Sequence, residues 1–208
     1  MPQFSFPNLM EAALMAVVLL FSVIVHEVAH GYVALRNGDP TARMLGRITM
    51  NPIPHIDPIG TILLPLLLLA SGAGIIFGWA KPVPVNPLNY RNYRWGELTV
   101  SAAGPLSNLA LAVLFSYLFR LGWGNMGLLM LAGFGVKINI FLALFNLIPI
   151  PPLDGSHILA ILLPPNLARV YAYLEPVGFI LILVLFYSGL MGVFIMPLYR
   201  LIASFLLG

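Results

Sequence analysis

Residues 9–35 read LMEAALMAVVLLFSVIVHEVAHGYVAL, an apolar run with no charged side chain between Ala12 and Val25. About 20 apolar residues in helical conformation are enough to cross the hydrocarbon core of a bilayer. The run therefore predicts a membrane-spanning helix. Close to its end, this helix carries three ionisable residues, His26, Glu27 and His30.

The composition of the whole chain places it in the same class. Of its 208 residues, 60% are hydrophobic and only 8% are charged, whereas a typical soluble domain has about 25% charged residues. We expect one integral-membrane domain, residues 1–208, embedded in a lipid bilayer. The chain has no cysteine, which excludes disulfides and thiolate metal sites. The basic residues lie mostly between apolar stretches, which is typical of membrane-flanking anchors and not of nucleic-acid binding.

The remaining apolar runs predict an all-α, polytopic helical bundle. About four spanning helices are expected, at about residues 9–35, 97–119, 126–148 and 174–201. The polar stretch 41–57 is predicted to be a loop that could close into a short β-hairpin. The apolar run 59–80 is interrupted by Pro65 and by Ser71-Gly72-Ala73-Gly74, so it could either span the membrane or re-enter it.

The pattern His26-Glu27-Val28-Ala29-His30 predicts a catalytic metal site. Two histidines four residues apart lie on one face of a helix and can bind the same Zn²⁺ ion. Glu27 projects about 100° away from His26, where it can act as a general base on a water at the metal. Ionisable residues are costly in an apolar helix and usually serve a function there. We expect one zinc ion per chain, bound by His26 and His30, with Glu27 as the catalytic residue.

A catalytic zinc site uses three protein ligands and an open position, and the pattern supplies only two. Asp154 is the most prominent further candidate, because it follows a helix broken by three prolines, where irregular backbone can present a carboxylate inside a membrane. Asp154-Gly155 is also a common turn dipeptide, so on its position alone both roles stay open. The candidates for the third ligand are Glu11, Asp39, Asp57, Glu97, Asp154, Glu175, His55 and His157.

Three segments resemble a known family when taken together: HEVAH at 26–30, AAGPLSN at 102–108 and FNLIPIPPLDG at 145–155. They are similar, in the same order, to the signature segments of the site-2 protease family of intramembrane zinc metalloproteases. The resemblance implies that His26, His30 and Asp154 bind zinc and that Glu27 is the catalytic acid/base. It also implies that Asn146 holds the substrate, a transmembrane segment of another protein, or the reacting carbonyl, while capping of the broken helix stays open as an alternative role for this residue. Gly104, Pro105 and Asn108 are expected to serve packing. The chain resembles a compact form without a PDZ domain.

This resemblance makes a demand on the topology. The zinc histidines lie near the end of the first helix, so Asp154 must emerge on the same side of the membrane. A full span over 59–80 would place it at the other surface, about 20 Å away. We therefore predict that 59–80 is a re-entrant hairpin turning near Ser71–Gly74. The basic residues then gather on one side, which predicts a multi-pass protein of the plasma or inner membrane with its site facing the cytosol.

One alternative function remains at this point. Broken helices and midmembrane histidines and acids also build the sites of metal or proton transporters. Lys137, in the middle of a predicted span, is a further intramembrane ionisable group. Pairing with an acid or a carbonyl inside the bundle is one possibility for it, and the sequence assigns it no role. The sequence specifies neither the substrate nor the oligomeric state.

Overall fold

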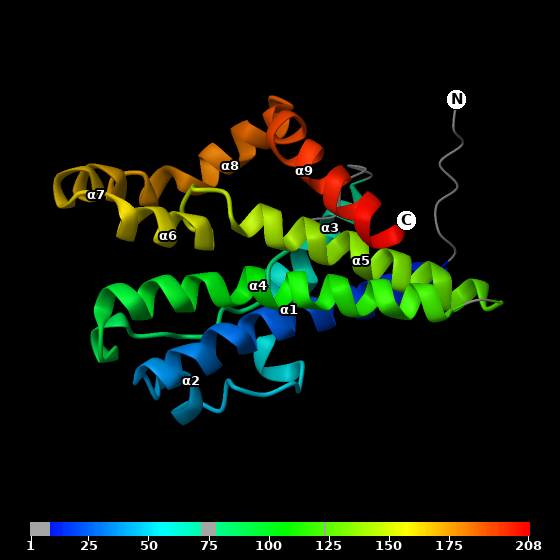
Figure 1. Ribbon diagram of the computed structural model, residues 1–208, viewed down its shortest axis with the longest axis horizontal. Coiled ribbons are helices and arrows are strands. Elements are labelled where there is room, and N and C mark those ends of the chain that lie inside the picture. The colour runs from blue at the N-terminus through cyan, green and yellow to red at the C-terminus, as the bar shows by residue number, and fades with distance from the viewer. Residues whose placement is uncertain (1–8, 72–77, 123) are drawn as a thin grey trace. The chain divides into compact units, whose positions relative to one another are not determined.

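The computed structural model describes residues 9–71, 78–122 and 124–208. These residues form helices joined by turns and by one extended segment, and no strand occurs among them (Figure 1). The prediction of an all-α protein is confirmed. Among the described residues, five helical stretches are long and apolar enough to cross a membrane: Met10–Asn37, Tyr93–Leu121, Met126–Asn146, Pro165–Tyr187 and Leu190–Leu207. The first three are helical where spans 9–35, 97–119 and 126–148 are expected, and their crossing of a membrane stays a prediction.

Two compact units make up the chain. Unit 1 comprises residues 1–22 and 105–208, and unit 2 comprises residues 23–104. The boundary falls inside two long helices, α1 (Leu9–Asn37) and α4 (Tyr93–Leu121). Each unit is described by itself.

Unit 1 is built around α5 (Met126–Asn146) and α9 (Leu190–Leu207). Its apolar core consists of Ala112, Val136, Ile140, Leu144, Met191, Ile195 and Leu206. A polar network lies beside this core. Asn108 donates to the Asn139 side chain and to the Ser22 carbonyl, and Asn139 donates to the Ser22 hydroxyl. All three residues are fully buried, so hydrogen bonds join α1, α4 and α5 in the interior of unit 1.

The last predicted span, residues 174–201, is not one helix. After α6 (Asp154–Leu162) and α7 (Pro165–Ala172), a short 3₁₀ turn (Glu175–Val177) leads into α8 (Gly178–Tyr187) and then α9. The chain changes direction between α8 and α9 (Figure 1). Gly189 has a φ of 75° at this break, a left-handed conformation that glycine adopts at little cost.

Unit 2 corrects the prediction for residues 41–57. Where a β-hairpin was considered, the chain forms α2 (Thr41–Met44) and a 3₁₀ turn (Ile53–His55). Pro52 and Pro54 have no amide hydrogen to donate to a β-ladder, which disfavours a hairpin here.

The apolar run 59–80 begins with a π-helical segment (Pro58–Leu63) followed by α3 (Leu64–Ala70). Its far end returns beside its start: the Trp79 amide donates to the Gly60 carbonyl at 3.1 Å, and the Thr61 hydroxyl donates to the Trp79 carbonyl at 2.8 Å. Residues 72–77, most of the predicted turn, lie outside the described residues. Re-entry into a membrane stays a prediction.

Candidate metal centre

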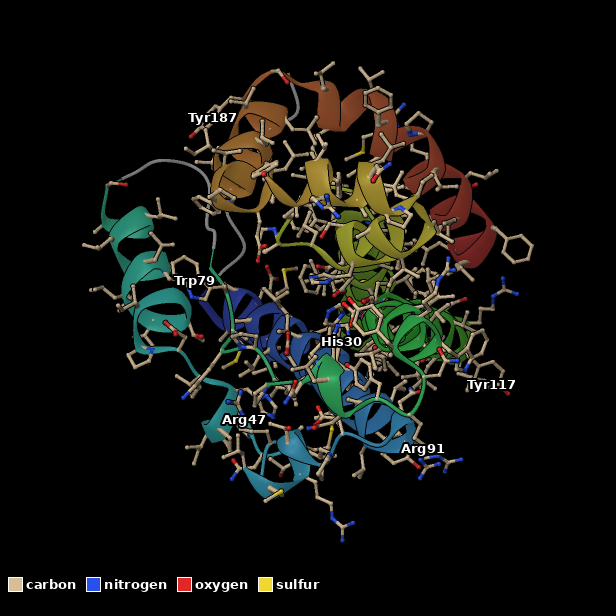
Figure 2. The ribbon with its side chains drawn as sticks, turned by 90° about the vertical axis from the view of Figure 1, so that its left-hand side faces the viewer. His30, Arg47, Trp79, Arg91, Tyr117 and Tyr187 are labelled. Carbon is tan, nitrogen blue, oxygen red and sulfur yellow. The ribbon has the colours of Figure 1, made fainter. Side chains whose placement is uncertain are left out.

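The two histidines of the HEVAH segment converge within unit 2. Both project from α1, and their Nε2 atoms lie 3.0 Å apart. His26 is buried and His30 is half-buried; Figure 2 labels His30 on α1. Two nitrogen ligands at about 2.0–2.1 Å from a tetrahedral zinc ion are roughly 3.3 Å apart. The spacing of the two Nε2 atoms therefore fits a shared zinc ion after a small adjustment.

A contact from α4 sets the tautomer of His30. Its Nδ1 lies 2.7 Å from the backbone carbonyl oxygen of Val100. A carbonyl can only accept, so Nδ1 must carry the hydrogen, and in the neutral ring Nε2 then carries the lone pair. Hydrogen bonding of the second ring nitrogen is the usual way in which a protein orients a metal-binding histidine. His30 is thus prepared to bind a metal through the nitrogen that faces His26.

Gly104, on α4, forms the wall beside this pair. A Cβ atom at Gly104 would overlap with Nε2 of His30 and with Cε1 and Nε2 of His26. Any other residue would fill the space in front of the two nitrogen atoms. Gly104 was predicted to serve packing, and the structure adds a second role for its missing side chain, which is to keep the ligand atoms accessible.

Glu27 lies next to His26 and is half-buried. One of its carboxylate oxygens, Oε2, accepts a hydrogen bond of 2.7 Å from the backbone amide of Val83. The pair joins α1 to the extended segment around Val83. Since an amide nitrogen only donates, the contact orients the carboxylate and occupies one of its oxygens. The sequence contained no signal for this contact, because it is made by a backbone group 56 residues away.

The other candidate ligands of unit 2 are engaged elsewhere. His55 places Nε2 at 2.9 Å from the Thr49 carbonyl, and Asp57 caps the π-helical segment by accepting from the amides of Ile59 and Gly60. Glu97 precedes Gly104 by seven residues, or about 10 Å along α4.

Asp39 is fully buried and accepts hydrogen bonds from Thr41, Asn86 and Asn89. Burial alone would raise the pKa of its carboxyl, but these hydrogen bonds outweigh burial and hold the pKa below its ordinary value of 3.8. Hydrogen bonds of Asp39 therefore join the C-terminal end of α1 to the segment 86–89.

The predicted site residues of unit 1 lie around the proline-rich turn. Asp154 is the first residue of α6 and is half-buried. Gly155 packs against the Leu147 carbonyl so closely that a Cβ atom would overlap with it. Asn146 ends α5, and its Nδ2 donates to the Leu142 carbonyl at 2.9 Å. His157 is exposed.

Lys137 received no role from the sequence, and the structure gives its surroundings. It is exposed on α5, and within the part of the chain that the structure describes it makes no hydrogen bond or ion pair. The possible pairing with an acid or a carbonyl inside the bundle is not found there.

Comparison with known proteins identifies the family. The family model for peptidase family M50 matches residues 14–124 and 122–185. The chain belongs to peptidase family M50. With its five candidate spans, this M50 member is a multi-pass membrane metalloprotease, and the predicted relation to the site-2 proteases is confirmed.

Curated relatives agree with this assignment. A protein of Bacillus subtilis (strain 168), named "Putative zinc metalloprotease YwhC", is 41% identical over 194 residues, which are 88% of this chain and 84% of the relative. Rip2 of Mycolicibacterium smegmatis is 34% identical over 169 residues, covering 80% of this chain and 63% of the relative. Rip2 of Mycobacterium tuberculosis (strain ATCC 25618 / H37Rv) is 32% identical over 174 residues, covering 80% of this chain and 64% of the relative. No solved structure matches the chain.

Proposed function

We propose that this M50 member is a zinc metalloendopeptidase of the HExxH, site-2 protease type, which hydrolyses peptide bonds within or near transmembrane segments. The observation that supports this most strongly is the 3.0 Å distance between the Nε2 atoms of His26 and His30. The contact of His30 with the Val100 carbonyl places the lone pair of its ring on Nε2, where it can bind a metal. Zinc bound there supplies Lewis-acid activation of the attacking water and of the scissile carbonyl.

Glu27 is the proposed general base. Its position next to His26 supports this role, because a side chain about 100° further around the helix can reach a water at the metal without being a ligand. It takes a proton from the attacking water and returns it to the leaving amine, which are steps typical of a positioned carboxylate. Its second oxygen stays bound to the Val83 amide throughout.

Asp154 is the proposed third ligand. Asp39, Asp57 and His55 are engaged in other hydrogen bonds. Among the candidate ligands, Asp154 alone matches the metal-binding position of the family segment FNLIPIPPLDG, and this match supports the proposal. Its place in the first turn of α6 also puts its backbone in a fixed helical geometry.

The remaining assignments concern the substrate and the membrane. Asn146 is proposed to contact the substrate backbone, and the substrates are proposed to be transmembrane proteins. The protein is proposed to lie in the plasma or inner membrane, with its site open to the cytosol, because Arg36, Arg43, Arg47, Lys81, Arg91, Arg94 and Arg169 gather on one side if 59–80 re-enters.

The test uses the purified chain in detergent and an internally quenched fluorogenic peptide built on one transmembrane segment. Chelator-sensitive cleavage is expected. Glu27→Gln should abolish cleavage and retain zinc, whereas His26→Ala should lose both. Cleavage by the Glu27→Gln variant would reject the general-base assignment. Zinc or proton flux into vesicles without proteolysis would instead favour the transporter alternative, which neither the family match nor these relatives support.

A further inference from the structure

The segment 81–86 is extended and lies against α1 in unit 2. It contains only four amide hydrogens, because Pro82 and Pro84 have none. Three of the four are bound: Lys81 donates to the His55 carbonyl, Val83 to Glu27 and Asn86 to Asp39. This segment, here called the strap, is therefore fixed along its whole length.

We propose that the strap and the buried Arg47 that holds it position Glu27 for catalysis. The inference rests on the proposed function, since it assigns Glu27 as the general base. Neither Arg47 nor Val83 would contact the substrate or the metal. Both are positioning residues, and they act through the hydrogen bond between the Val83 amide and Oε2 of Glu27.

The Val83 side chain seats the strap on α1. It is only 6% exposed, and a Cβ atom at Gly31 would lie 2.9 Å from its Cγ1. Gly31 follows Glu27 by one helical turn, on the same face of α1. The absence of a side chain at Gly31 lets the backbone of Val83 approach closely enough to bind Glu27.

Arg47 holds the strap from the other side. Its Nη2 donates to the Lys81 carbonyl at 2.8 Å and to the Pro82 carbonyl at 3.2 Å. These are the two carbonyls directly before the Val83 amide. Arg47 is 8% exposed, and Figure 2 shows it on the segment that follows α2. Removing the guanidinium would leave the Lys81 and Pro82 carbonyls without this donor, so it should release the strap.

The consequence for catalysis is geometric. A general base works only within hydrogen-bond reach of the proton that it removes, and a carboxylate without the Val83 contact could rotate away. A displacement of about 1 Å in an active site can reduce the rate about 100-fold. The strap should therefore affect kcat and leave metal binding unchanged, because the contact that orients His30 comes from Val100 on α4 and not from the strap.

Two pairs of variants test this in the full chain with the fluorogenic peptide. Val83→Pro deletes the amide hydrogen, and Val85→Pro is its control, because Val85 also follows a proline and is 37% exposed. Arg47→Gln removes the guanidinium, and Arg43→Gln, at an exposed position after the start of α2, is its control. We expect Val83→Pro and Arg47→Gln to lower kcat about 10- to 100-fold, with KM and zinc content within about twofold. Arg47→Lys should restore part of the loss.

An independent readout needs no substrate. In hydrogen–deuterium exchange, the strap should show one fast amide, that of Val85, and Glu27→Ala should add a second, that of Val83. Unchanged exchange in Glu27→Ala, or equal kcat for the Val83→Pro and Val85→Pro variants, would overturn the inference even if cleavage by the unmodified chain is chelator-sensitive. Absence of such cleavage would instead reject the proposed function, and this inference with it.

Discussion

A side chain at Gly104 would occupy the space directly in front of Nε2 of His30. This relationship predicts that Gly104→Ala blocks zinc binding, because its methyl group would overlap with the ligand atoms of both histidines. We expect zinc affinity to fall by about 100-fold or more. Removing a hydrogen-bond partner of a metal ligand already lowers affinity by about 10- to 100-fold, and blocking the ligand atoms should cost at least as much. Titration with zinc and a competing chelator measures it.

Gly192→Ala is the matched control for this variant. Gly192 lies inside α9, and a Cβ atom there meets nothing within 4 Å. Zinc affinity of the control should equal that of the unmodified chain. Normal zinc binding by Gly104→Ala would contradict the geometry described for the site.

The topology of residues 59–80 gives a second prediction. Asp39 binds Asn86 and Asn89, so the two flanks of this run lie together within unit 2, as a re-entrant hairpin requires. The chain has no cysteine, and single cysteines can therefore be placed at Met44 and Leu88, which are 79% and 88% exposed. A membrane-impermeant maleimide should label both from the same side in oriented vesicles. Labelling from opposite sides would reject the hairpin.

Much of this architecture could be predicted from the sequence. The helices α1, α4 and α5 are long apolar runs with polar ends, and in an all-helical membrane protein such runs have one stable conformation. HEVAH predicted the convergence of His26 and His30 because the α-helical period alone determines it. These features depend on local sequence.

The features that escaped prediction depend on distant backbone groups or on weak local signals. The break between α8 and α9 lies in a run that is apolar on both sides, and Ser188-Gly189 is its only mark. The contacts of Val100 with His30 and of Val83 with Glu27 are made by a backbone carbonyl and a backbone amide. Such groups occur in nearly every residue, so the sequence gives no signal for these contacts. Arg47 was interpreted only as a basic residue flanking the membrane.

The buried network of unit 1 predicts coupled stability. Asn139→Leu should leave the Ser22 hydroxyl and the Asn108 side chain without that partner and cost about 1–2 kcal/mol, since single interhelical hydrogen bonds in membranes average about 0.6 kcal/mol. Asn108→Leu should cost a similar amount. Because the two side chains share a hydrogen bond of 2.9 Å, the double variant should lose less than the sum of the two. Thermal unfolding in detergent measures all three, and strict additivity would contradict the network.

Asp39 predicts a pH dependence of stability. Burial alone would raise the pKa of Asp39, but hydrogen bonds from Asn86, Asn89 and Thr41 hold it below 3.8 in the folded chain. Above about 3.8 the carboxylate is charged in both states and its stabilisation is complete. As pH falls below that value the unfolded chain takes up the proton first, so stability declines until the folded pKa is passed.

Melting temperatures between pH 2.5 and about 7, measured with a chelator present so that zinc release does not contribute, should fall at the acid end. Asp39→Asn should have a lower melting temperature at neutral pH, corresponding to a loss of about 1–3 kcal/mol of unfolding free energy. Its melting temperature should also fall less steeply at acid pH. An unchanged acid slope in Asp39→Asn would assign the pH dependence to other carboxylates.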